Sequence, residues 1–240
     1  MSRALRLSKP PAIPALAATP ALVVLSRAAN LAAPPVGRDR RLEAALRRGM
    51  DILVAGAALV ALAPAGLLVG IAIRLDSPGP VLFRQTRIGR NGRPFTLFKF
   101  RSMHLDAESR RAGLLGGSDR DGLCFKARRD PRVTRVGRLL RRFSIDETPQ
   151  FWNVLRGEMS MVGPRPALPE EVAAYPARAR RRLAVKPGLT GIWQVSGRAE
   201  VGFDRMIEMD LAYMRTRSLA MDLWLMAMTF RAVLGGRGAY

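Results

Sequence analysis

The chain has 240 residues, and its 40 Lys and Arg against 19 Asp and Glu give a formal net charge of +21 at pH 7. A single cysteine excludes an internal disulfide framework, and a single histidine argues against histidine-based metal sites and Ser-His catalysis, so a zinc enzyme is not expected. A charge this positive predicts a polyanionic neighbour, which can be nucleic acid, an anionic membrane surface or a phosphorylated substrate.

Residues 1–45 are rich in alanine and proline, and we expect them to form a largely disordered tail. Prolines recur through this stretch and would interrupt any long helix. A basic start followed by a short apolar run also resembles a signal peptide, which is the alternative interpretation.

Residues 46–75 form the second expected unit, a membrane segment. The run 50–73 is almost uncharged and is long enough to reach across a bilayer core. Pro64 lies near its middle and should bend a helix there. Arginines flank the run on both sides, and positive charge favours the cytoplasmic side, so both flanks obey that rule only if the segment enters and leaves by one face. We therefore expect a re-entrant helix bent at Pro64, with a straight span or a buried helix of a soluble core as alternatives.

Residues 76–240 are expected to form the catalytic domain, of α+β class, mainly helical with a small β-hairpin. Two apolar-aromatic runs within 81–100 flank Asn91-Gly92, a strong hairpin signal. Helical segments are expected over 104–115, from a Thr134 cap to about 143, and over 170–184. The stretch 203–234 has helical spacing, and it either packs in the core or lies as interfacial helices on a membrane.

Two adjacent carboxylates, Asp146 and Glu147, lie at the start of a predicted helix, which Pro149 fits in its first turn and Gly157 ends. Asp and Glu are common at a helix start, so capping is the ordinary interpretation of this pair. The helix dipole there should favour their ionised form. Arg165 follows in a rigid Gly-Pro-Arg-Pro turn, and an acidic pair with a nearby cation in so basic a chain suggests an anionic substrate.

Several short motifs then occur in a fixed order: Ser77-Pro78-Gly79-Pro80, Arg87-Ile88-Gly89, Phe98–Met103, Asp130–Thr134, the block 144–166, Pro187–Gly191 and Gln194–Arg198. Through these motifs the chain from about Arg47 to Tyr240 resembles the monotopic bacterial sugar transferases, which are polyprenyl-phosphate phosphoglycosyl transferases. The resemblance is greatest to members that begin exopolysaccharide or capsule synthesis with a hexose phosphate.

The resemblance implies transfer of a sugar-1-phosphate from a UDP-sugar to polyprenyl (undecaprenyl) phosphate, with release of UMP, at the cytoplasmic face of the bacterial inner membrane. It implies that Asp146 carries the phospho-sugar covalently, that Glu147 assists, and that Mg²⁺ binds close to Asp146. It also implies that Arg165 binds phosphate. Anionic lipids are expected as membrane partners, no nucleic acid is expected because no recognition motif is present, and a homodimer is left open.

Further residues match the family less specifically. Arg101 and Arg198 are candidate phosphate-binding residues, although Arg101 could equally cap the hairpin. Gln150 and Asn153 lie within helical reach of the acidic pair and are expected to support it. The remaining family positions are Asp210, Tyr213 and Asp222, of which the two aspartates could instead be ion-pair partners of nearby arginines.

Two functions from other classes compete with this one. A basic membrane-anchored binding protein without chemistry would also explain the charge, and a conventional glycosyltransferase would release UDP in place of UMP.

Overall fold

The computed structural model describes residues 40–110, 130–196 and 201–235. Within them the protein is mainly helical, with two small sheets, as the α+β prediction required. The expected tail at 1–39 and Arg198 lie outside the described residues.

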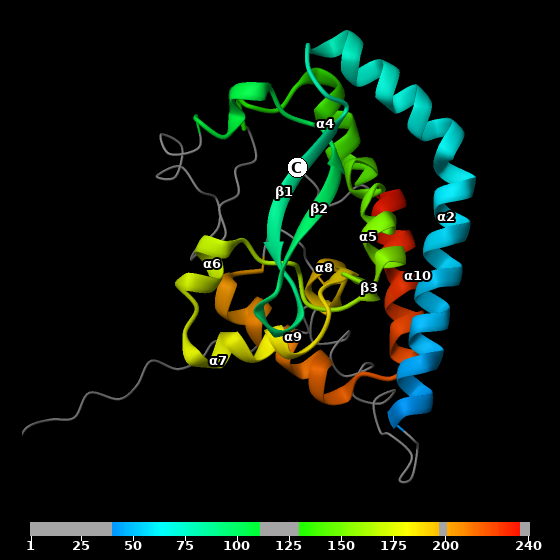
Figure 1. Ribbon diagram of the computed structural model, residues 1–240, viewed down its shortest axis with the longest axis vertical. Coiled ribbons are helices and arrows are strands. Elements are labelled where there is room, and N and C mark those ends of the chain that lie inside the picture. The colour runs from blue at the N-terminus through cyan, green and yellow to red at the C-terminus, as the bar shows by residue number, and fades with distance from the viewer. Residues whose placement is uncertain (1–39, 111–129, 197–200, 236–240) are drawn as a thin grey trace, which may run out of the picture.

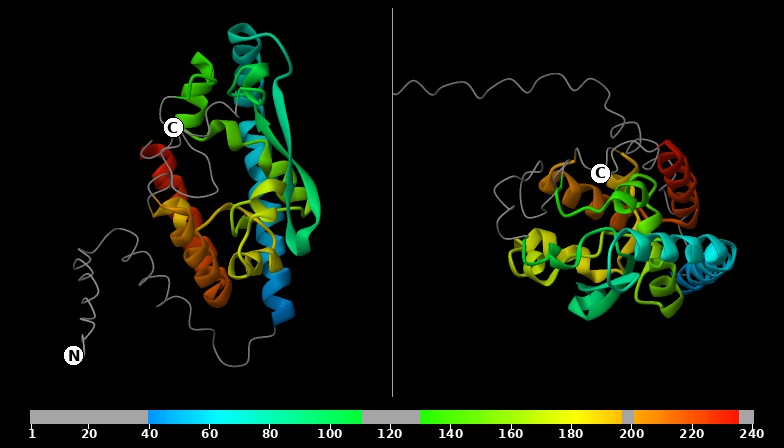
Figure 2. Two further views of the ribbon diagram at one scale, coloured as in Figure 1. Left: turned by 90° about the vertical axis from the view of Figure 1, so that its left-hand side faces the viewer. Right: turned by 90° about the horizontal axis from the view of Figure 1, so that it is seen from above.

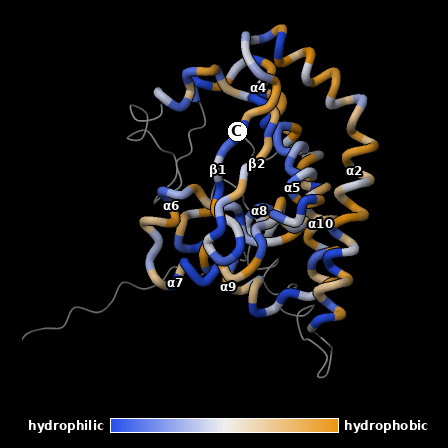
Figure 3. The backbone as a smooth tube through the Cα atoms, viewed as in Figure 1, coloured by the Kyte–Doolittle hydropathy of each residue, from blue (hydrophilic) through white to orange (hydrophobic). Residues whose placement is uncertain are grey.

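The helix α2 (Arg40–Asp76) is the longest element and carries the apolar run. Its most apolar part has a mean hydropathy of 2.5, only 6% of that part is buried, and the helix is long and apolar enough to enter a membrane. Such exposure argues against the buried helix of a soluble core. Pro64 lies inside the helix, which also includes residues 40–45. Figure 1 shows α2 rising along one side of the domain and turning over at its upper end, and Figure 3 shows its apolar composition.

The lower part of α2 is fixed to the domain by two charged side chains. Arg48 donates from Nη1 to Val154 O and from Nη2 to Leu155 O, both at 2.6 Å. These carbonyls lie in the last turn of α5 (Gln150–Arg156), where backbone acceptors lack helical partners and the helix dipole is negative. Asp51 is 3% exposed and accepts from Met161 N at 2.8 Å. The apolar helix and the rest of the domain are therefore joined through charge-assisted bonds.

The predicted hairpin is confirmed as β1 (Leu82–Ile88) paired antiparallel with β2 (Pro94–Phe100). At the turn, Asn91 has φ 59° and Gly92 has φ 77°, a left-handed conformation that these two residue types tolerate well. The register places Phe83 opposite Lys99, Gln85 opposite Leu97 and Arg87 opposite Phe95. Directly opposed residues project from the same face, so Gln85, Arg87 and Lys99 share one side of the hairpin.

The predicted helices are partly right. Thr134 caps α4 (Arg135–Arg142) by accepting from Gly137 N at 2.9 Å, as expected. The helix over 104–115 is wrong for its described part, which is only a 3₁₀ turn at Leu105–Ala107, and residues 111–115 lie outside the described ranges.

The stretch 170–184 is also interrupted, forming α6 (Pro169–Ala173), α7 (Ala177–Arg180) and a 3₁₀ turn at Arg181–Ala184. Pro176 stands between the two helices, where it lacks an N–H and disfavours helical backbone in the residue before it.

The stretch 203–234 divides into α9 (Phe203–Thr216) and α10 (Leu219–Gly235). Their buried faces supply much of the hydrophobic core, which confirms the core interpretation; Met206, Met209, Met221 and Leu225 are almost fully buried. The left view of Figure 2 shows these two helices on one side of the domain and the hairpin on the other.

A second sheet was not predicted. The short strands β3 (Ser160–Val162) and β4 (Gly188–Thr190) pair in parallel, and α8 (Ile192–Val195) follows β4. A Cβ atom on Gly188 would collide with the backbone of Gly163, so glycine is needed at this crossing. The pairing fixes the start of the Gly-Pro-Arg-Pro turn that carries Arg165, because Gly163 N donates to Thr190 O at 2.9 Å.

Candidate active site

The acidic pair lies in a 3₁₀ turn, Ile145–Glu147, between α4 and α5. Ser144 has φ 54°, an uncommon left-handed conformation for a residue with a side chain, and it turns the chain out of α4. Pro149 is the N-cap of α5, so Asp146 and Glu147 precede the helix rather than occupying its first turn. Gly157, with φ 79°, ends α5 as predicted.

The surroundings of Asp146 reverse the expected effect on its charge. Asp146 is 8% exposed, and this burial, reinforced by the charge of Glu147, raises its pKa to about 6 despite the opposing effects of Lys99 and Arg141. Desolvation therefore outweighs the helix dipole that was expected to favour the ionised form. At neutral pH the carboxylate is still mostly ionised while being poorly solvated, which suits a nucleophile.

Lys99 forms ion pairs with both carboxylates. Its Nζ lies 2.7 Å from Glu147 Oε1 and 4.0 Å from Asp146 Oδ2. The side chain of Glu147 is 37% exposed and that of Asp146 is 11% exposed. The two carboxylates thus differ in environment: that of Asp146 is buried, whereas that of Glu147 is partly exposed to solvent and paired with Lys99. Such a difference favours different chemical roles for the two groups.

Asp146 lines a cavity of about 930 Å³, within the size range of nucleotide-sized ligands. The walls come from the hairpin, the 100–108 segment, α4 and the start of α6. Most charged side chains that line it are cationic, and phosphates are attracted to such a surface; they are Arg84, Arg87, Lys99, Arg101, Arg132, Arg141 and Arg165.

Arg165 reaches the same cavity as Asp146, so the structure brings the predicted nucleophile and the predicted phosphate-binding residue together. Its side chain is 28% exposed, and its Nη1 lies 3.3 Å from Glu171 Oε2. Arg165 also borders a smaller cavity of about 90 Å³ together with Glu147 and Gln150.

Arg101 binds backbone carbonyls of the segment between α2 and the hairpin. It is 5% exposed, donates from Nη2 to Ser77 O at 2.7 Å, and binds Pro78 O through Nη1. It therefore fixes the segment that leaves α2, while its side chain still lines the large cavity. Phosphate binding by Arg101 and by Arg198 stays a prediction.

Gln150 and Asn153 are both buried, and their support of the acidic pair stays a prediction. Asn153 is fully buried, accepts from Phe98 N at 3.1 Å and donates to Thr96 O at 2.7 Å, so it ties β2 to α5. Gln150 is 3% exposed and borders the smaller cavity beside Glu147.

Asp210, Tyr213 and Asp222 line neither cavity. Asp210 lies 2.5 Å from Arg182 Nη2, and the same nitrogen donates to Arg165 O at 3.1 Å. Tyr213 donates to Asp222 at 2.8 Å, and Asp222 lies 3.1 Å from Arg47 Nε. Both aspartates are thus ion-pair partners of arginines, as the structural alternative proposed.

Sequence reasoning missed five residues that shape this site: Arg87, Lys99, Arg141, Glu171 and Arg182. Arg87 and Lys99 belong to the quoted motifs and alternate with apolar residues on one hairpin face, which could have indicated an inward charge. Glu171 lies at the third position after the N-cap of α6, the position of a capping box, and Arg182 is hidden in a run of arginines.

The residues present fit a magnesium ion of the usual kind. The described residues hold no group of three or more His, Cys, Asp or Glu that could hold a metal ion alone. Mg²⁺ is commonly held by one or two carboxylates, with substrate phosphates and water completing its shell. Asp146 and Glu147 are adjacent on one turn, with Asp146 lining the large cavity and Glu147 lining the smaller one, and together they meet that requirement.

Comparison with known proteins gives a consistent result. The family described as "Bacterial sugar transferase" matches residues 42–236. The galactosyl transferase CpsE of Streptococcus agalactiae is 46% identical over 168 residues, which cover 70% of this chain and 37% of CpsE. An undecaprenyl-phosphate glucose phosphotransferase of Komagataeibacter xylinus is 43% identical over 209 residues, covering 81% of this chain and 37% of that protein. The chain thus spans well under half the length of these two relatives.

A shorter relative matches along most of its length. The exopolysaccharide production protein ExoY of Sinorhizobium fredii is 38% identical over 208 residues, which cover 85% of this chain and 92% of ExoY. Both this match and the family match to residues 42–236 cover the part of the chain that contains the hairpin, the acidic turn and the turn with Arg165. The chain therefore belongs to the bacterial sugar transferase family.

Proposed function

We propose that the protein transfers a sugar-1-phosphate from a UDP-sugar to polyprenyl phosphate and releases UMP. The observation that carries the proposal is the buried carboxylate of Asp146 at the wall of a large, cation-lined cavity that Arg165 also reaches. The names of relatives support the class of substrate, since two of them are called undecaprenyl-phosphate glucose and galactose phosphotransferases.

The proposed reaction has two displacements at one phosphorus atom. In the first, a carboxylate oxygen of Asp146 attacks the phosphorus that bears the sugar, the bond from that phosphorus to the UMP oxygen breaks, and UMP leaves. In the second, a phosphate oxygen of the polyprenyl phosphate attacks the same phosphorus, and the bond to Asp146 breaks. The carboxylate is restored, and the product is a polyprenyl diphosphate-sugar. Splitting one displacement into two is the usual role of such a nucleophile.

The cations supply the electrostatic part of the mechanism. Lys99 and Arg141 act on the charge of Asp146, and Arg165 lines the same cavity, so these three cations can offset the repulsion between a carboxylate and an incoming diphosphate. Arg165 can bind two phosphate oxygens with its planar fork, and Lys99 adds a point charge. When bound by Asp146 and Glu147, Mg²⁺ would screen the same repulsion and stabilise the leaving phosphate.

Glu147 is suited to assist rather than to attack. Its carboxylate is held by Lys99 at 2.7 Å and is 37% exposed, so it is better solvated than Asp146. We infer that it positions Lys99 and exchanges protons with water at the cavity edge.

The membrane arrangement belongs to the same proposal. The apolar part of α2 would embed in one leaflet as a re-entrant helix bent at Pro64, with both flanking arginine groups on the cytoplasmic side. A lipid phosphate in the headgroup layer and a soluble nucleotide sugar would then meet at one membrane face. The hexose pathway would be exopolysaccharide or capsule synthesis, as the names of the ExoY relatives suggest.

The test is UMP release from a panel of UDP-sugars by membranes that contain the protein. Asp146→Asn should abolish release while the protein is still recovered in the membrane fraction. Asp204→Asn is the matched control, because Asp204 is an exposed partner of Arg178 on α9 and should leave release unchanged. Normal turnover by Asp146→Asn would refute the covalent mechanism, and release of UDP in place of UMP would indicate a conventional glycosyltransferase.

A further inference from the structure

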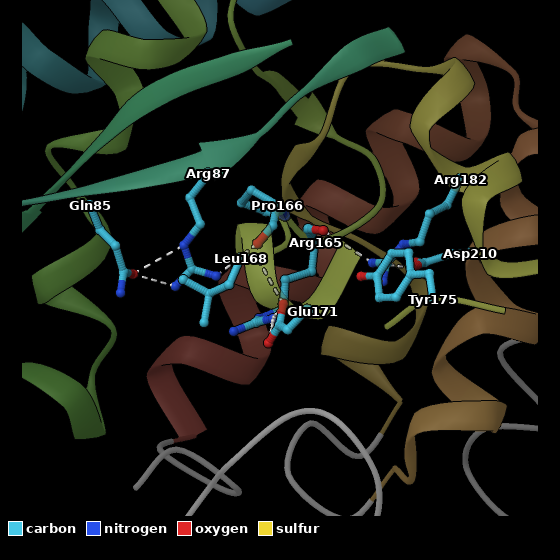
Figure 4. Close-up of polar contacts among 9 residues, drawn as sticks. All are labelled: Gln85, Arg87, Arg165, Pro166, Leu168, Glu171, Tyr175, Arg182 and Asp210. Atoms are coloured by element: carbon cyan, nitrogen blue, oxygen red, sulfur yellow. Dashed lines mark hydrogen bonds and ion pairs between the residues drawn. The ribbon is translucent and has the colours of Figure 1, made fainter. Parts of the chain in front are cut away.

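The backbone around Arg165 is held by two other arginines, as Figure 4 shows. Arg182 donates to Arg165 O at 3.1 Å, and Arg87 donates from Nη1 to Pro166 O at 3.0 Å. Both of these arginines are themselves fixed, Arg182 by Asp210 at 2.5 Å and Arg87 by Gln85 Oε1 at 2.6 Å. The main chain that carries Arg165 is thus anchored from opposite sides by buried groups.

The ion pair between the side chains of Arg165 and Glu171 is long. The contacts from Arg165 to Glu171 both use Nη1, at 3.3 Å to Oε2 and 3.4 Å to Oε1. Charge-assisted bonds of this kind are normally about 2.7–2.9 Å long, so this pair is loose. Arg165 is 28% exposed at its side chain, whereas the Glu171 side chain is 3% exposed.

The Glu171 carboxylate is fixed by the backbone and would keep its position if the Arg165 guanidinium moved. Its Oε2 accepts from Leu168 N at 2.8 Å and closes the first turn of α6. An anion in the cavity can therefore draw Arg165 away from Glu171, but Glu171 stays at the cavity wall.

We propose that Glu171 competes with the substrate for Arg165. The substrate diphosphate displaces the Glu171 carboxylate from the Arg165 guanidinium, and the ion pair between the two side chains forms again when the product leaves. The proposal rests on the proposed function, in which Arg165 binds phosphate. It assigns to Glu171 the control of how tightly donor and leaving nucleotide are held.

The charges around the pair make this exchange feasible. Arg87 is buried beside Arg165, and its pKa is lowered to about 10 by burial and by the Arg165 charge, while Glu171 acts in the opposite sense. Glu171 therefore interacts electrostatically with Arg87 as well as forming the ion pair with Arg165. When a phosphate takes Arg165, the positive charge of Arg87 still acts on the buried carboxylate, so the exchange does not leave Glu171 without a favourable charge.

The test is direct binding of UDP and of inorganic diphosphate to the full chain in detergent or nanodiscs, measured by calorimetry. Glu171→Gln removes the charge but keeps an oxygen that can accept from Leu168 N, so thermal unfolding should be nearly unchanged. Both ligands should bind about 2-fold to 5-fold more tightly, the range expected when a partly screened ion pair stops competing. Glu208→Gln is the control, because it removes the same charge from an exposed pair with Arg205 on α9 and should change nothing.

Two further measurements separate competition from other roles of Glu171. In an Arg165→Gln background, Glu171→Gln should no longer tighten ligand binding, because the guanidinium for which Glu171 and the ligand compete is absent. In turnover assays, KM for the UDP-sugar should fall together with the inhibition constant of UMP.

Binding that is unchanged or weaker in Glu171→Gln would overturn the proposal, because Glu171 would then position Arg165 or be inert. Failure of the parent protein to bind either diphosphate would overturn it too. Diphosphate binding needs no turnover, so a protein that binds diphosphate but releases no UMP would disprove the proposed function and leave the result for Glu171 standing.

Discussion

The substitution Lys99→Gln should move the acidic limb of the pH–rate profile upward. In the proposed mechanism the reacting form of Asp146 is the carboxylate, and the pKa of Asp146 is raised to about 6, so the rate of the parent protein should fall as the pH drops through about 6. Lys99 opposes this rise, since its Nζ lies 4.0 Å from Asp146 Oδ2. Without the ammonium group the carboxylate loses a stabilising charge, and its pKa should rise further.

The size of the change follows from the distance. Two unit charges 4.0 Å apart interact by about 4 kcal/mol at an effective dielectric constant near 20 and by about 1 kcal/mol in bulk water. The side chains of Asp146 and Lys99 are 11% and 25% exposed, so the site lies between these limits. At about 1.4 kcal/mol for each tenfold change in proton affinity, the limb should move up by roughly one to three pH units.

The assay is the initial burst of UMP release between pH 5 and 9, which reports the first displacement even where turnover is slow. Arg205→Gln removes a positive charge from an exposed position on α9 and is the control. An acidic limb that stays near pH 6 in Lys99→Gln, or moves down, would refute the assignment of that limb to Asp146 beside Lys99.

Two other predictions concern the frame of the site and its anchor. Asp210→Asn should lower the free energy of unfolding by about 3–5 kcal/mol, because it strips the buried Arg182 of its partner, and it should raise KM for the donor; an unchanged denaturation midpoint would contradict this. Single cysteines at Leu42 and Leu75, in a Cys124→Ser background, should be labelled from the same side of the membrane, and labelling from opposite sides would show a straight span.

The elements that local chemistry specifies were predictable. Asn91-Gly92 sets the hairpin turn, Thr134 caps α4 and Gly157 ends α5, and each acts within a few residues of its own position. The apolar composition of α2 was equally plain in the sequence.

The parts that were missed depend on distant partners. The strands β3 and β4 are three residues each and lie 28 positions apart, so no local pattern marks them. Arg182 and Arg87 bind backbone carbonyls 17 and 79 residues away, which only the folded chain brings near. The raised pKa of Asp146 has the same origin, because burial by the surrounding elements cannot be inferred from a turn that reads as a solvent-exposed helix start.

The attachment of Arg48 to the end of α5 has a consequence for acceptor choice. The turn with Asp146 and Glu147 immediately precedes α5, so if α2 inserts in a bilayer as proposed, its depth would also set the distance between Asp146 and the lipid headgroups. In the proposed membrane arrangement, this attachment would favour a lipid phosphate at the headgroup layer over the same phosphate free in solution or held deeper in the bilayer. Acceptors would be selected by the depth of their phosphate in the membrane as much as by their chemistry. A thicker or thinner bilayer would change the depth that is favoured without any change in the residues of the cavity.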